Sequence, residues 1–81
     1  MAARKAVAIR LSPGQERELN ELVRAHTTPQ KLAERARIIL LAAAGKGMDE
    51  SAEELGVWRK TVRHWRRRWE AAKPRWVLLN A

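Results

Sequence analysis

The sequence of 81 residues is long enough for one domain with one core, and the absence of cysteine excludes disulfides, thiolate metal sites and cysteine nucleophiles. Its longest apolar run, residues 38–44, is far shorter than the roughly 20 residues of a membrane-spanning helix, so we expect a cytoplasmic protein without a membrane partner. The net charge of +8 is uneven, because residues 57–81 carry eight basic side chains and one acidic side chain, and this asymmetry indicates a polyanion bound at that end.

The first twelve residues are predicted to form an arm that precedes the helical domain. Within it, residues 6–11 are typical of a short strand or an extended segment. Ser12 offers an N-cap oxygen, Pro13 suits the first helical position and Gln15 completes a capping box, so a helix is expected to begin near Pro13. The predicted apolar stripe of this helix consists of Leu19, Leu22, Val23 and His26.

His26 closes this first helix, and we expect it to interact with the carbonyl groups at the helix end. A second helix should follow at once, because Thr28 can cap it and Pro29 fits its first turn. This helix is predicted to run to about Ala44, before two glycines, and its C-terminal half is apolar on nearly all sides. Such a helix is expected to be packed on two sides.

Two further helices are predicted in the C-terminal half of the chain. A short one is expected over residues 49–55, with Asp49 as its N-cap and with Gly56 ending it in the left-handed conformation. The last helix is expected over residues 59–72. The remaining residues, 73–81, are predicted to form an apolar, extended C-terminal tail.

The two last helices carry the spacing of a helix-turn-helix motif. A small residue is followed by a glycine four positions later and by apolar residues at five, ten and thirteen positions: Ala52, Gly56, Val57, Val62 and Trp65. The small residue allows the helices to cross, the glycine supplies a positive φ, and the last two apolar residues face inward. We therefore predict an all-α fold over residues 13–72, in which one additional helix precedes a trihelical DNA-binding unit. The sequence leaves open whether short strands form at the two termini.

The last helix has an apolar side and a basic side. On a helical wheel, the apolar side consists of Trp58, Val62, Trp65 and Trp69. Six of the eleven residues 59–69 are basic and none is acidic. We interpret this helix as a recognition helix in the major groove of double-stranded DNA, where Lys and Arg side chains read guanine edges and grip phosphates. The structural alternative is a solvated basic face on an amphipathic helix.

The predicted DNA-binding residues all lie in this helix. Those expected in the groove are Lys60, Arg63, His64 and Arg67. Those expected to contact phosphates or flank the groove are Arg59, Thr61 and Arg68. An exposed histidine without a role is the alternative for His64.

No catalytic residue, metal ligand, cofactor or small-molecule substrate is predicted, and we expect the protein not to be an enzyme. The acidic side chains of residues 49–54 are interpreted as a helix N-terminus and its solvated face, because early carboxylates favour the helix dipole. The two histidines have no further metal ligand near them in the sequence.

Four runs of the sequence carry a family resemblance: IRLS at 9–12, RARIILLAAAG at 35–45, LGV at 55–57 and KTVRHWRRRW at 60–69. Over about residues 6–71 the chain resembles the N-terminal DNA-binding domain of bacterial insertion-sequence transposases of the mariner superfamily. The resemblance implies that the trihelical unit is homeodomain-like and binds the terminal inverted repeats of a mobile element. A separate domain with three metal-binding carboxylates performs strand transfer in that family, and this sequence does not contain it.

The sequence departs from the family pattern at three places. Position 51 is Ser where the family usually has Ile or Leu, which removes a core side chain from the short helix. Position 58 is Trp where a capping Ser or Thr is usual, and Trp58 either fills the space left by Ser51 or faces solvent or a partner. Residues 73–79 replace a Gly-rich continuation. Our hypothesis is a truncated or decayed transposase gene, or a piece taken from one.

Two other functions remain open. One is a dimeric transcriptional repressor or antitoxin-like regulator. Residues 6–11 and the tail could pair as strands within one chain or between two chains, and pairing between chains would give a homodimer. The other is a protein-interaction module that docks residues 76–79 on a partner, with an incidental basic helix. RNA binding is less favoured, because no aromatic platform is interleaved with the basic residues on the outer face of the last helix.

Overall fold

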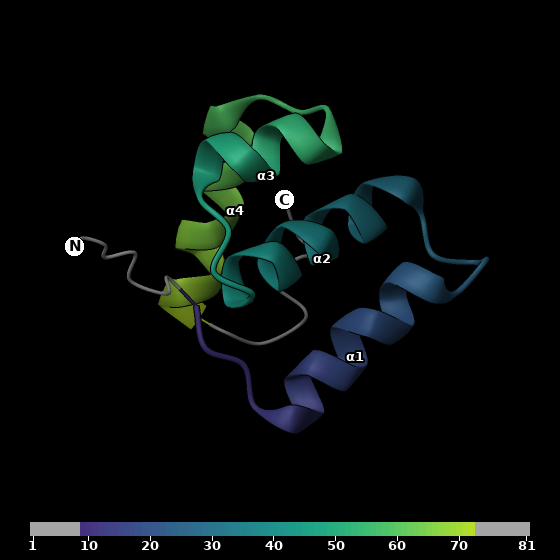
Figure 1. Cartoon of the computed structure of the whole chain (residues 1–81). Coiled ribbons are helices and arrows are strands. Elements are labelled where there is room, and N and C mark those ends of the chain that lie inside the picture. The colour runs from purple at the N-terminus through teal and green to yellow at the C-terminus, as the bar shows by residue number, and fades with distance from the viewer. Residues whose placement is uncertain (1–8, 73–81) are drawn as a thin grey trace.

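The computed structural model describes residues 9–72, and these residues form four helices (Figure 1). The helices are α1 (Pro13–Arg24), α2 (Gln30–Ala43), α3 (Met48–Leu55) and α4 (Arg59–Ala72). The predicted all-α fold is therefore confirmed. Residues 9–12 are not part of a strand, whereas the other residues of the predicted terminal strands and the whole tail lie outside the described residues.

The N-terminal end of α1 is fixed by the predicted capping box. The Ser12 hydroxyl accepts a hydrogen bond of 3.1 Å from the backbone N–H of Gln15, and the Ser12 N–H donates to Oε1 of Gln15 at 3.0 Å. Two otherwise unpaired N–H groups of the helix start are thereby satisfied. At the other end, α1 ends at Arg24, and His26 is an exposed residue of the following turn. The predicted place of His26 on the apolar stripe is therefore wrong, because the helix has already ended.

The start of two helices differs from the sequence-based expectation. The N-cap of α2 is Pro29, which makes no side-chain cap, so the predicted cap at Thr28 is wrong by one residue. The N-cap of α3 is Gly47, whose carbonyl accepts a hydrogen bond of 2.9 Å from the N–H of Ser51. Asp49 is therefore not the cap but lies in the first turn, where its carboxylate still favours the helix dipole.

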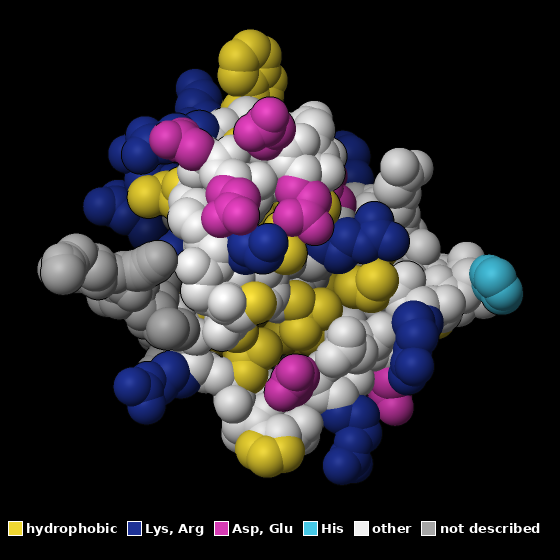
Figure 2. Space-filling view, viewed as in Figure 1, with side chains coloured by type: hydrophobic (Ala, Val, Ile, Leu, Met, Phe, Trp, Pro, Cys, Tyr) yellow, Lys and Arg dark blue, Asp and Glu magenta, His cyan; other side chains and the backbone are white. Residues whose placement is uncertain are grey.

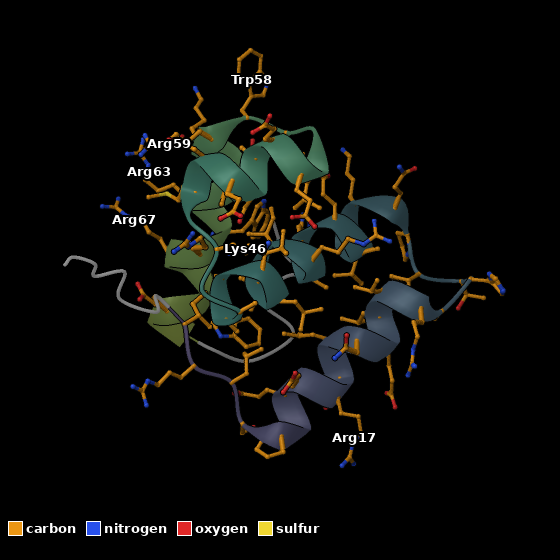
Figure 3. The ribbon with its side chains drawn as sticks, viewed as in Figure 1. Arg17, Lys46, Trp58, Arg59, Arg63 and Arg67 are labelled. Atoms are coloured by element: carbon orange, nitrogen blue, oxygen red, sulfur yellow. The ribbon has the colours of Figure 1, made fainter. Side chains whose placement is uncertain are left out.

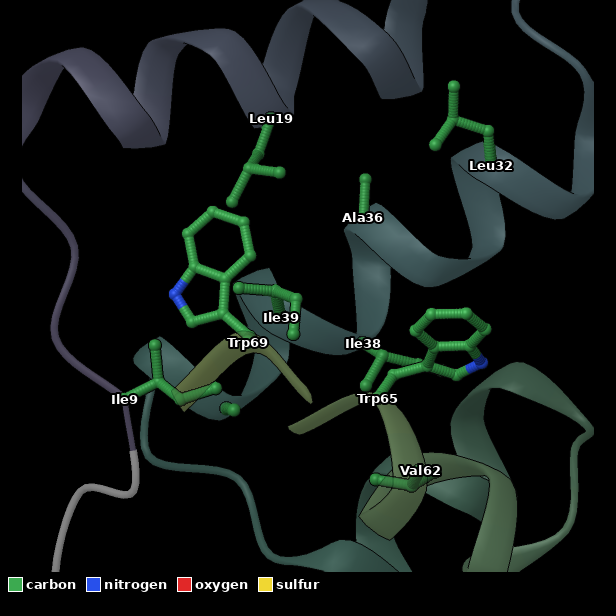
Figure 4. Packing of buried hydrophobic residues seen from close by; sticks show 10 residues of the cluster. Ile9, Leu19, Leu32, Ala36, Ile38, Ile39, Val62, Trp65 and Trp69 are labelled. Carbon is green, nitrogen blue, oxygen red and sulfur yellow. The ribbon is translucent and has the colours of Figure 1, made fainter. Parts of the chain in front are cut away.

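Helix α2 lies at the centre of the molecule and contacts the other three helices (Figure 1). Ile38 and Ile39 are both fully buried, although neighbouring residues of a helix point about 100° apart. This confirms that the C-terminal half of α2 is packed on two sides. The core cluster is completed by residues from α1, α2, α4 and the segment before α1 (Figure 4): Ile9, Leu19, Leu32, Ala36, Ala42, Val62, Trp65 and Trp69. Helix α3 packs against this cluster with side chains that are only partly buried.

Ser51 faces this core from α3. Its side chain is 0% exposed, and its hydroxyl has no hydrogen-bond partner among the described residues. The sequence-based expectation that position 51 points inward is therefore confirmed. A buried hydroxyl without a partner costs free energy, because it has lost its hydrogen bonds to water.

We expect Ser51→Ala to raise the free energy of unfolding by about 1 kcal/mol, because alanine removes the unpaired hydroxyl and has a higher helix propensity. Urea unfolding followed by circular dichroism measures the change. The matched control is Ser12→Ala, which should lower the free energy of unfolding by about 1 kcal/mol, because it deletes the cap of α1. A loss of stability in both variants would contradict the expectation for Ser51.

Candidate nucleic-acid interface

The turn between α3 and α4 has the geometry of a helix-turn-helix. Gly56 adopts the left-handed conformation at φ 70° and ψ 35°, as predicted, and the Val57 N–H donates a hydrogen bond of 3.0 Å to the Ala52 carbonyl. A Cβ atom at position 56 would meet no atom within 4 Å. Glycine is therefore favoured there by the positive φ and not by lack of space.

One side of α4 is buried against the other helices. Val62, Trp65 and Trp69 are 0%, 6% and 2% exposed, which confirms the predicted core roles of the two tryptophans. Figure 4 shows Trp69 close to Leu19 of α1 and to Ile9, the residue that anchors the segment before α1. These contacts leave only the opposite side of α4 to face outward.

Trp58 does not belong to this buried side, so its predicted position on the apolar stripe is wrong. Its side chain is 80% exposed. Trp58 precedes α4, and its carbonyl accepts hydrogen bonds from the N–H groups of Thr61 at 3.0 Å and Val62 at 3.2 Å. A helical wheel predicts the direction of side chains only for residues inside the helix, and Trp58 lies outside it. Trp58 consequently does not fill the space beside Ser51.

The outward side of α4 carries the four residues predicted for the groove. Lys60, Arg63, His64 and Arg67 are all exposed. Figure 3 shows Arg63 and Arg67 projecting from the same edge of the molecule as Arg59. His64 additionally contacts the edge of the Trp65 ring, with the ring centroids 4.8 Å apart and nearly perpendicular planes. The buried Trp65 ring thus packs against His64, a residue of the exposed basic side.

Arg59 is held by an acidic residue of the preceding helix. Its Nε atom lies 2.7 Å from Oδ1 of Asp49, and both side chains are more than half exposed. Three other carboxylates, those of Glu50, Glu53 and Glu54, are exposed on α3. Figure 2 shows the acidic side chains gathered beside a group of Lys and Arg side chains. The start of α4 is therefore the boundary between an acidic and a basic surface.

The remaining two predicted contact residues are only partly accessible. Thr61 is half-buried and lines a shallow hollow together with Lys60, His64 and Trp65. Arg68 is also half-buried, with its Cζ atom 5.6 Å from the centroid of the Trp65 ring. The structure thus places the predicted residues on one helix but at different depths, and their contact with DNA stays a prediction.

Two arginines that the sequence did not single out position α4. The guanidinium of Arg35 in α2 lies 4.3 Å from the centroid of the Trp65 ring, a cation–π distance. Arg66 donates a long hydrogen bond of 3.5 Å to the carbonyl of Lys46 in the loop before α3. No local pattern in the sequence reveals these contacts, because each joins residues of different elements.

The described residues contain no group of three or more side chains able to hold a metal ion. None of the helices in this described part is long and apolar enough to cross a membrane.

A family model described as a homeodomain-like domain matches residues 29–74 of the chain. The chain belongs to this family. The match includes α2, α3 and α4, which form the homeodomain-like unit, and begins after α1, so α1 is an addition to that unit. It supports a helix-turn-helix DNA-binding domain. A search of the curated proteins and a search of the solved structures each gave no significant match.

In a homeodomain-like unit, the third helix is the one that reads the major groove of DNA. In this chain the third helix of the unit is α4. The family membership and the distribution of side chains on α4 therefore point to the same surface.

Proposed function

We propose that this domain binds double-stranded DNA sequence-specifically, with the outward side of α4 in the major groove. The observation that carries the proposal is the division of α4 into a buried side, led by Trp65 and Trp69, and an exposed basic side. Arg63 and Arg67 lie four residues apart and about 6 Å apart along the helix axis, a spacing at which both can reach base edges or phosphates of one groove.

We further propose that the bound DNA is the terminal inverted repeat of an insertion sequence. The support is the resemblance of the chain to the DNA-binding domain of mariner-superfamily transposases, which the homeodomain-like membership fits. The proposed role of the domain is binding alone, and no described residue is assigned a catalytic step.

Selection of bound sequences from a random pool of duplex DNA tests both proposals. The selected duplex should bind much more tightly than a scrambled one, and log K should fall with log salt concentration by about 0.9 for each phosphate contacted. An asymmetric site bound by one chain fits an inverted-repeat binder. A palindromic site bound by two chains, counted by light scattering, would replace it by a dimeric regulator, and a failure to enrich any sequence would contradict specific binding.

Asp49 competes with DNA for Arg59, so we expect Asp49→Asn to raise the affinity for duplex DNA. The exposed ion pair is worth no more than about 1 kcal/mol, and its removal should therefore increase affinity about two- to fivefold. Fluorescence anisotropy with the selected duplex at low salt measures this change.

The matched control is Glu53→Gln, which removes the same charge from α3 without breaking the pair between Arg59 and Asp49. It should raise the affinity less than Asp49→Asn does. Equal gains in the two variants would mean that only the total charge matters and that Arg59 does not reach the DNA.

A further inference from the structure

Trp58 is the one large hydrophobic side chain that is exposed among residues 9–72. An indole kept in water forgoes the favourable free energy that burial of its apolar ring would contribute. The contacts assigned to the basic residues do not explain this ring, because an indole carries no charge for a phosphate and has a single N–H donor on a large apolar surface. The ring nevertheless stands at the start of the helix that the proposed function places in the groove.

The backbone of Trp58 is held at the start of α4. Two hydrogen bonds to its carbonyl, from Thr61 and Val62, tie the residue to the first turn of α4. Figure 3 shows the Trp58 side chain projecting from the end of the molecule at which α4 begins, in a different direction from Arg59, Arg63 and Arg67, which project together from the adjoining edge.

In helix-turn-helix proteins the N-terminal residues of the recognition helix are those that approach base edges. If α4 enters the groove as proposed, Trp58 lies at the DNA surface and not on the far side of the protein. Its chain neighbours Arg59 and Lys60 are exposed and basic, and although Arg59 is paired with Asp49 of α3, two cations beside the ring suit a polyanion better than an apolar protein partner.

The major groove offers one apolar group to such a ring, the C5-methyl of thymine. We propose that Trp58 contacts a thymine methyl beside the bases approached by the start of α4, and thereby specifies an A·T pair in the site. This inference rests on the proposed function. Trp58 would then recognise a base through an apolar contact, beside the cationic side chains that contact guanine and phosphate.

The test uses the duplex selected by the wild-type chain, with each thymine replaced in turn by uracil, which lacks only the methyl group. One replacement should lower wild-type affinity about fourfold, the equivalent of about 0.8 kcal/mol for one methyl-sized group. Trp58→Ala should lower affinity for the unmodified duplex about tenfold. In this variant the uracil replacement at that position should have almost no further effect.

Two variants serve as controls. Trp58→Leu keeps an apolar side chain and should retain most of the discrimination between thymine and uracil. Arg17→Ala changes an exposed residue of α1, away from α4 in Figure 3, and should leave affinity and discrimination unchanged. Because Trp58 is exposed, the thermal unfolding of Trp58→Ala should match that of the wild type, which separates loss of contact from loss of fold.

The inference is overturned if each uracil replacement costs the same in wild type and Trp58→Ala, if Trp58→Ala binds as tightly as wild type, or if the selected site has no thymine. In these cases the wild-type chain still prefers its selected duplex, so the proposed function stands. If instead the wild type shows no preference among duplexes, the proposed function itself fails.

Discussion

The double variant Arg63→Glu, Arg67→Glu is expected to lose DNA binding while keeping its fold. Each substitution removes a contact worth about 1–3 kcal/mol and places a carboxylate near phosphates, so affinity should fall at least about a hundredfold. Both side chains are exposed, and their replacement leaves the core untouched. Anisotropy titration of the selected duplex at low salt measures the loss, and circular dichroism verifies the helices.

The matched control carries the same change in net charge elsewhere. Arg17→Glu, Lys31→Glu alters two exposed residues of α1 and of the first turn of α2, both distant from α4 in the fold (Figure 1). It should reduce affinity only slightly, through the weaker long-range field. Unchanged binding by the Arg63, Arg67 variant in dilute buffer would show that another surface faces the DNA.

The largest expected effect on stability is that of Trp69→Ala. The ring is 2% exposed and packs where α1, α2 and the segment around Ile9 meet α4. Large-to-small changes of this kind cost about 3–5 kcal/mol. A domain of this size is stable by only about 5 kcal/mol, so the variant should be largely unfolded at room temperature. Urea unfolding and the circular dichroism signal of the helices measure this outcome.

Trp58→Ala is the natural control, because it deletes the same side chain from an 80% exposed position. Its free energy of unfolding should differ from wild type by less than about 0.5 kcal/mol. A similar loss of stability in the two tryptophan variants would contradict the division of α4 into a core side and an outward side.

The features that the sequence predicted correctly depend on residues close together in the chain. The capping box of Ser12 and Gln15 joins positions three apart, and the left-handed turn at Gly56 depends on a single glycine. The inward direction of Trp65 and Trp69 follows from the helical period, which holds once a helix is established. The sequence therefore predicted the helices, their order and the buried side of α4.

The features that the sequence did not predict arise at helix boundaries or between elements. The wheel placed Trp58 on the apolar side of the last helix because it treated a residue outside α4 as part of the helix, and the sequence left open whether its ring is buried or exposed. Asp49 is a good cap by type, yet α3 begins one residue earlier, after Gly47. The stack of Arg35 on Trp65 needs α2 and α4 to cross at one point, which no local spacing determines.

The acidic surface of α3 also affects how the domain meets its target. The four carboxylates of α3 are gathered in one group on the surface (Figure 2), whereas α4 carries six basic side chains and one acidic side chain, and this uneven distribution gives the domain an electric dipole. Near a polyanion, the electrostatic torque on this dipole rotates the domain while it diffuses. Most encounters then occur with the arginines of α4 facing the polyanion. Counter-ions shorten the range of this torque to about 10 Å at 0.1 M salt. In the proposed complex, the rate of association therefore depends on the carboxylates of α3 as well as on the basic side chains assigned to the groove.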